Sequence, residues 1–74
     1  MEAFIKHFAA QFEDTDQEVF KPETKFREID EWSSLISLSV IAMVDEEYKV
    51  KLKGEDIRNA HTIEDLYEII KSKM

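Results

Sequence analysis

The chain of 74 residues has room for one domain, and its 43% apolar and 36% charged residues are the balance of a globular protein rather than a disordered one. Its 17 acidic and 10 basic residues give a net charge of −7, which opposes nucleic-acid phosphates and anionic lipids as partners. There is no cysteine and one glycine, which excludes disulfides, cysteine nucleophiles and glycine-rich phosphate loops. No apolar run is long enough to span a membrane and the first residues lack the layout of a signal peptide, so we expect a soluble, monomeric, cytoplasmic domain.

The first segment is predicted to be a helix over residues 2–12. Its apolar residues recur at the spacing of one buried helix face, and they are Phe4, Ile5, Phe8, Ala9 and Phe12. Residues 13–33 then form a long connection that contains Pro22 and carries eight acids against three basic residues. A connection of this length needs anchors in the core. The predicted anchors are Val19, Phe20, Phe26, Ile29 and Trp32.

Three further helices are predicted after this connection, over residues 34–48, 55–59 and 62–73. Ser33 or Ser34 can cap the first of them, because a serine hydroxyl accepts a hydrogen bond from an amide at a helix start. Thr62 is followed three residues later by Asp65, a pattern close to a capping box. We therefore expect residues 1–74 to form a single all-α domain, a small four-helix bundle with three longer helices, one short helix and a long first loop.

The start and the end of the 34–48 helix carry a further pattern. Phe26 lies eight residues before the pair Ser34-Leu35, and fourteen residues after Ser34 comes Tyr48, preceded by three acids. In this register the chain resembles the acyl carrier protein family, in which a phenylalanine precedes the serine of an Asp-Ser-Leu motif at the start of the second helix. The helix order, the long acidic loop, the length and the acidity match as well, so the resemblance covers nearly the whole chain.

The resemblance implies that Ser34 is the attachment site of a 4′-phosphopantetheine arm, with Ser33 and Leu35 flanking it. A phosphopantetheinyl transferase would transfer the arm from coenzyme A. The chain would then carry acyl groups as thioesters to acyl-transferring or condensing enzymes of fatty acid, polyketide or related specialised pathways. The cofactor would supply the thiol that the chain lacks, so the resemblance implies a carrier with no catalytic residues of its own.

Ser33 is the main departure from the family pattern, because the family has an aspartate immediately before the modified serine. Two adjacent serines leave open which one is modified, and Leu35 together with the spacing to Tyr48 favours Ser34. The missing carboxylate is one that the family is thought to present to the modifying transferase. We expect Asp30 and Glu31, just upstream, to supply the negative charge in its place.

The face of the 34–48 helix that meets partners is a second departure. A helical wheel places Leu38, Ile41, Val44 and Tyr48 on one side, which we expect to be the core side. The other side predicts a partner-binding surface that is apolar near Ser34 and acidic further along, formed by Ile36, Ser39, Met43, Glu46 and Glu47. The alternative is that Ile36 and Met43 pack under the long connection.

The sequence leaves two other functions open and disfavours two kinds of site. The chain can be an aminoacyl or peptidyl carrier, since the same arm serves those cargoes. It can also be a helical interaction module that keeps the carrier fold but is never modified, and the serine at position 33 favours this alternative. His7 and His61 have no metal-ligand spacing, and Ser34 lacks the turn of a serine hydrolase, so we expect no metal site and no catalytic triad.

Overall fold

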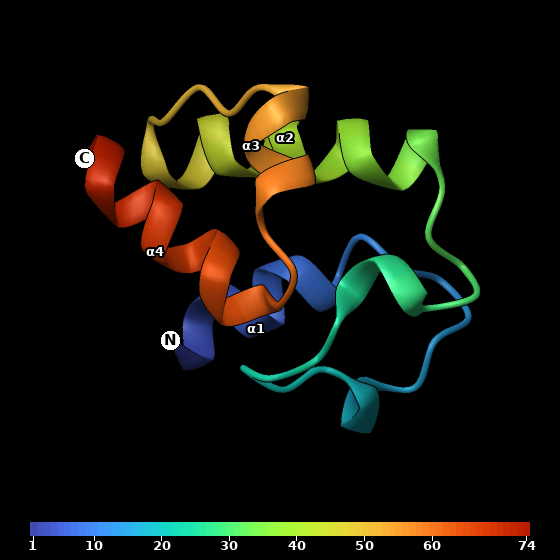
Figure 1. Cartoon of the computed structure of the whole chain (residues 1–74). Helices are drawn as coiled ribbons and strands as arrows, with labels where there is room; N and C mark the ends of the chain where they lie inside the picture. The colour runs from blue at the N-terminus through green and yellow to red at the C-terminus, as the bar shows by residue number, and fades with distance from the viewer.

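The computed structural model describes all of residues 1–74, and its regular elements are all helices, with no strand. Four α-helices follow one another along the chain, α1 (Glu2–Ala9), α2 (Ser34–Tyr48), α3 (Gly54–Asn59) and α4 (Ile63–Lys73). Two short 3₁₀ helices, η1 (Gln17–Val19) and η2 (Phe26–Glu28), lie in the connection between α1 and α2. In Figure 1 the short α3 crosses in front of the middle of the long α2, and the two helices line a common groove. The prediction of a small all-α bundle is confirmed.

The ends of the helices follow from their local hydrogen bonds. α1 ends at Ala9 rather than at the expected residue 12, because the next amides turn to carbonyls three residues back, with Gln11 donating to Phe8 and Phe12 to Ala9. At α4 the Thr62 hydroxyl accepts from the Asp65 amide at 3.1 Å, and the Asp65 carboxylate accepts from the Thr62 amide at 3.1 Å. This reciprocal cap confirms the predicted start of the last helix.

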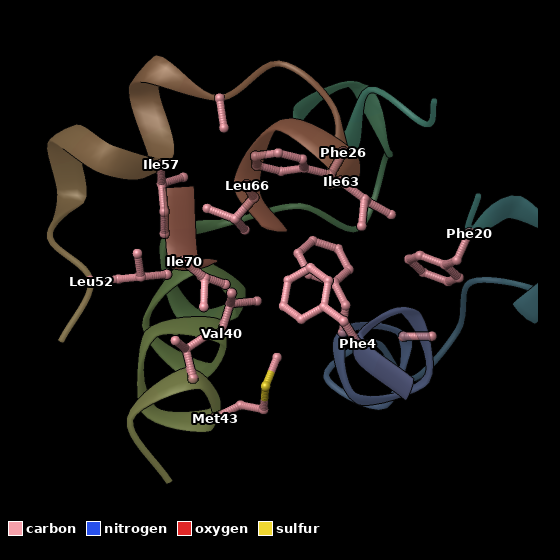
Figure 2. Close-up of a cluster of buried hydrophobic side chains, with 14 of the residues drawn as sticks. Phe4, Phe20, Phe26, Val40, Met43, Leu52, Ile57, Ile63, Leu66 and Ile70 are labelled. Atoms are coloured by element: carbon pink, nitrogen blue, oxygen red, sulfur yellow. The ribbon is translucent and has the colours of Figure 1, made fainter. Parts of the chain in front are cut away.

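The buried face of α2 agrees with the expected one in part. Val44 is buried, and Ile41 and Tyr48 pack against the core as predicted, while Leu38 is 62% exposed. Val40 and Met43 are buried as well. Figure 2 shows Val40 and Met43 pointing from α2 into the buried cluster. The wheel misplaced Leu38 and Met43 because no residue from Ser33 to Val44 is charged. Without a charged face, several apolar stripes are available, and packing against α1 and α4 selects one of them.

The long connection is held in the core by aromatic side chains. The ring of Phe8 on α1 lies 6.1 Å from that of Phe20, 5.5 Å from that of Phe26 and 6.4 Å from that of Trp32. Three of the predicted anchors are thereby confirmed, and Ile29 also packs against the core. Val19 is 42% exposed, so its prediction as an anchor is wrong.

Backbone hydrogen bonds tie the same connection to the start of α4. The amide of Ile63 donates to the carbonyl of Thr24 at 3.1 Å, and that of Glu64 donates to the carbonyl of Pro22 at 2.9 Å. The first amides of a helix have no hydrogen-bond acceptor within the helix. At α4, carbonyls of the connection accept the hydrogen bonds of two of these amides. None of the helices combines the length and the apolar character needed to cross a bilayer.

A pair of aspartate substitutions on α2 tests this orientation. Met43→Asp would bury an unpaired carboxylate at a cost of about 3 kcal/mol or more, which is comparable with the whole net stability of so small a domain. Leu38→Asp adds the same charge on the exposed side, and the chain should remain folded. Far-ultraviolet circular dichroism during urea unfolding measures both. Equal loss of stability in the two variants would contradict the assigned orientation.

Candidate functional site

The two adjacent serines at the start of α2 have different roles. Ser33 is the N-cap, and its hydroxyl accepts a hydrogen bond from the amide of Ile36 at 3.3 Å. Ser34 is the first residue of the helix, exposed, with a hydroxyl that is engaged in no hydrogen bond. The positive end of the helix dipole lies at this point and favours negative charge. Ser34 is therefore the serine whose hydroxyl is free to carry an anionic group.

A groove of about 550 Å³ opens beside Ser34 and runs between α2 and α3. Leu38 and Ile41 line it from α2, and Ile57 and Arg58 line it from α3. Seven residues of helix separate Ser34 from Ile41, which corresponds to about 10 Å along the axis. The groove thus offers apolar contact for an elongated group that is attached at Ser34.

The exposed face of α2 carries large apolar side chains near this serine. Leu35 is 76% exposed and Leu38 62% exposed. Ser39 and Glu46 are also exposed, one and three turns further along. Exposed leucines side by side are typical of a surface that meets another protein.

Three of the residues predicted to face partners are buried, half-buried or turned toward α1. Met43 is 7% exposed and belongs to the core, so its assignment to a partner-binding surface is wrong. Ile36 is half-buried and packs against the same core. Glu47 is exposed but turns toward α1, where its Oε1 lies 3.8 Å from Nε2 of His7.

Glu31 does not stand in for the missing aspartate beside Ser34, and that expectation is wrong. Its Oε1 accepts from the Thr15 hydroxyl at 2.7 Å and the Asp14 amide at 3.0 Å, and its Oε2 accepts from the Glu13 amide at 2.7 Å. The hydrogen bond from Thr15 and then that from the Glu13 amide lower the pKa of the Glu31 carboxyl. This carboxylate closes the first part of the connection.

Asp30 also lies away from the groove that begins at Ser34. It lines a separate hollow of about 850 Å³ within the connection, together with Glu31, Asp14, Glu23 and Glu28. Five of the eight acids of the connection thus line this hollow, and none lines the groove beside Ser34.

The arginines of the groove were missed at the level of sequence. Arg27 and Arg58 both line it, from η2 and α3 respectively. Arg27 also contacts His61, whose Nδ1 lies 3.3 Å from Nη2 of the arginine. These residues are far apart in the chain and share no motif, so only the packing of η2 against the α3–α4 turn reveals the cluster. No group of three histidine, aspartate or glutamate side chains is arranged to hold a metal ion.

Comparisons of the chain with protein-family models, with curated proteins and with solved structures find no match. The assignment of a function depends on the geometry at Ser34 and on the motif spacing along the sequence.

Alanine substitutions separate the two serines by stability. Ser33→Ala removes the cap of α2 and should lower the free energy of unfolding by about 1 kcal/mol. Ser34→Ala removes an unbonded, exposed hydroxyl and should leave the free energy of unfolding within about 0.5 kcal/mol of the unsubstituted chain. Chemical denaturation of both variants gives the comparison. A larger loss for Ser34→Ala would reverse the assigned roles.

Glu31→Gln should lower stability at neutral pH, because an amide oxygen cannot replace a carboxylate that accepts from three donors. The folded-state pKa of Glu31 is depressed, so its stabilising effect is present above its ordinary pKa of 4.5 and is lost as pH falls through the lower, folded-state value. The two chains should therefore converge in stability in acid. Unfolding midpoints from pH 7 downward measure this, with Glu23→Gln as the exposed control. A difference that is independent of pH would contradict the role of Glu31.

Proposed function

We propose that the chain is a carrier protein that bears 4′-phosphopantetheine on Ser34 and delivers acyl groups, as thioesters, to separate biosynthetic enzymes. The observation that carries the proposal is the free, exposed hydroxyl of Ser34 at the start of α2, opening onto a groove that Leu38 and Ile41 line from the same helix. The motif spacing around this serine supports the same function. The proposal places the chain in the cytoplasm, with a phosphopantetheinyl transferase and acyl-transferring or condensing enzymes as partners.

The residues around Ser34 fit such an arm. Its phosphodiester would be linked to the Ser34 oxygen, where the positive end of α2 favours the negative charge. Ser33 holds the first turn of the helix in place through its cap, so the attachment point is fixed. Leu38 and Ile41 give the arm apolar contact along the groove. When bound, the arm supplies the thiol that carries the cargo, in a chain that has no cysteine.

The remaining residues of the site would contact partner proteins and take no part in a chemical step. The exposed side chains of Leu35 and Leu38 flank the attachment point and present apolar area to an approaching enzyme. An aminoacyl or peptidyl cargo would use the same attachment and the same surface. In this proposal the chain breaks no bond, and each chemical step belongs to the enzyme that receives the arm.

A second candidate is an interaction module of the same fold that is never modified. The observation that favours it is Ser33, which stands where the carrier pattern has an aspartate and which is occupied as the helix cap. In that case Leu35 and Leu38 would be the core of a binding surface with no arm beside it.

Modification in vitro distinguishes the two candidates. The chain is incubated with coenzyme A and a phosphopantetheinyl transferase of broad specificity, and its intact mass is measured. The carrier proposal predicts a gain of one phosphopantetheine, which is lost in Ser34→Ala and retained in Ser33→Ala. An unchanged mass under these conditions would sink the carrier proposal and leave the interaction module.

A further inference from the structure

Both arginines of the chain lack an acidic partner. The chain has 17 carboxylate side chains and two arginines, Arg27 and Arg58. Its ion pairs all involve lysines or a histidine. Arginine forms bidentate bonds with carboxylates, which lysine cannot do. In a chain this acidic, we would therefore expect both arginines to pair with an acid.

The guanidinium of Arg27 is held in place by a backbone carbonyl and an imidazole ring. Its Nη1 donates to the carbonyl of Arg58 at 3.1 Å, and its Nη2 lies 3.3 Å from Nδ1 of His61. A guanidinium has five N–H donors, so three of those on Arg27 remain unused. The arginine is positioned without being neutralised.

The guanidinium of Arg58 lies over Gly54, one turn earlier on α3. Its Nη1 is 3.5 Å from the place where a glycine Cβ would be, so the open space above Gly54 admits the side chain. It makes no hydrogen bond through the guanidinium and no ion pair. Both arginines line the groove that begins at Ser34, and no acid does.

The surroundings extend this positive region. Arg27 also lines a neighbouring hollow of about 410 Å³ with Lys25 and His61, where Glu28 is the one acid. Four other acids of the connection, Asp14, Glu23, Asp30 and Glu31, line a different hollow. A chain of net charge −7 thus keeps a cationic wall beside its free serine. The planar fork of arginine suits oxyanions such as phosphates and carboxylates.

We propose that Arg27 and Arg58 form an anion-binding site in the groove, which takes an oxyanion from the group attached at Ser34. Two sources share this chemistry, the phosphodiester of the arm and a carboxylate at the far end of a dicarboxylic acyl cargo. Both would be tethered at Ser34, so the inference that either is the natural ligand rests on the proposed function. Binding of a free anion by the two arginines does not depend on that function.

The unmodified chain tests the site directly. Inorganic phosphate, glutarate and pentanoate are titrated into the nitrogen-15-labelled protein, and the arginine Nε–H signals and the His61 amide are followed by NMR. Phosphate and glutarate should give saturable shifts, and pentanoate weaker ones. Arg58→Gln should weaken binding about tenfold, which corresponds to the loss of one charge-assisted hydrogen bond. Lys6→Gln makes an equal change of charge at an exposed residue of α1 and should leave binding unchanged. Absence of saturable shifts, or equal losses in the two variants, would overturn the site.

Loaded proteins then separate the two sources. The transferase attaches arms from coenzyme A, pentanoyl-coenzyme A and glutaryl-coenzyme A, and the same signals are compared. Shifts on attachment of the unacylated arm identify the phosphodiester as the ligand. Shifts that appear with glutaryl but not with pentanoyl cargo identify a distal carboxylate. If Ser34 is modified and no loaded form moves the arginine signals, the natural ligand is not on the arm. A failure to load would contradict the proposed function and leave the titrations of the unmodified chain to decide the anion site.

Discussion

The position of Ser34 depends on how the chain crosses from α1 to α2. That connection contains no α-helix, and the side chains that fix it converge on Phe8. The ring centroid of Phe26 lies 5.5 Å from that of Phe8, and the ring centroid of Trp32 lies 6.4 Å from it. Trp32 immediately precedes the serine that caps α2. Packing of this ring therefore sets the direction in which the chain enters the helix, and with it the place where the Ser34 hydroxyl meets solvent.

The charged side chains are distributed unevenly around Ser34. Five acids of the connection line its own hollow, and one of them, Glu31, accepts hydrogen bonds from residues 13–15 and so ties the two ends of the connection together. The first turns of α2 are uncharged, and the facing groove wall carries Arg27 and Arg58. Electrostatic complementarity contributes more to specificity and to the rate of association than to affinity. A basic docking surface that suits an acidic helix would find no complementary charge beside Ser34, whereas an apolar surface would meet Leu35 and Leu38.

Features set by neighbouring residues could be predicted from the sequence, and those set by tertiary packing could not. Thr62 and Asp65 define the start of α4 by themselves, because a capping box needs only local hydrogen bonds. The spacing to Phe26 and Tyr48 predicts Ser34 as an attachment site, and that role stays a prediction. The helical wheel placed Val44 correctly but not Leu38, because the uncharged first turns of α2 leave the wheel without a polar side. Likewise, nothing near Glu31 in the sequence shows that it binds the amide of Glu13, and nothing near Arg27 shows that it reaches the carbonyl of Arg58.

The central claim is that Ser34, and not its neighbour, carries the arm. Trypsin cleaves after Arg27 and Lys49, so residues 28–49 form one peptide that contains both serines. Fragmentation of this peptide in a mass spectrometer, after treatment of the unsubstituted chain with transferase and coenzyme A, locates the added group between adjacent residues. The account predicts that fragments containing Ser33 but not Ser34 keep their unmodified mass. Attachment at Ser33, or a peptide that carries no added mass, would contradict it.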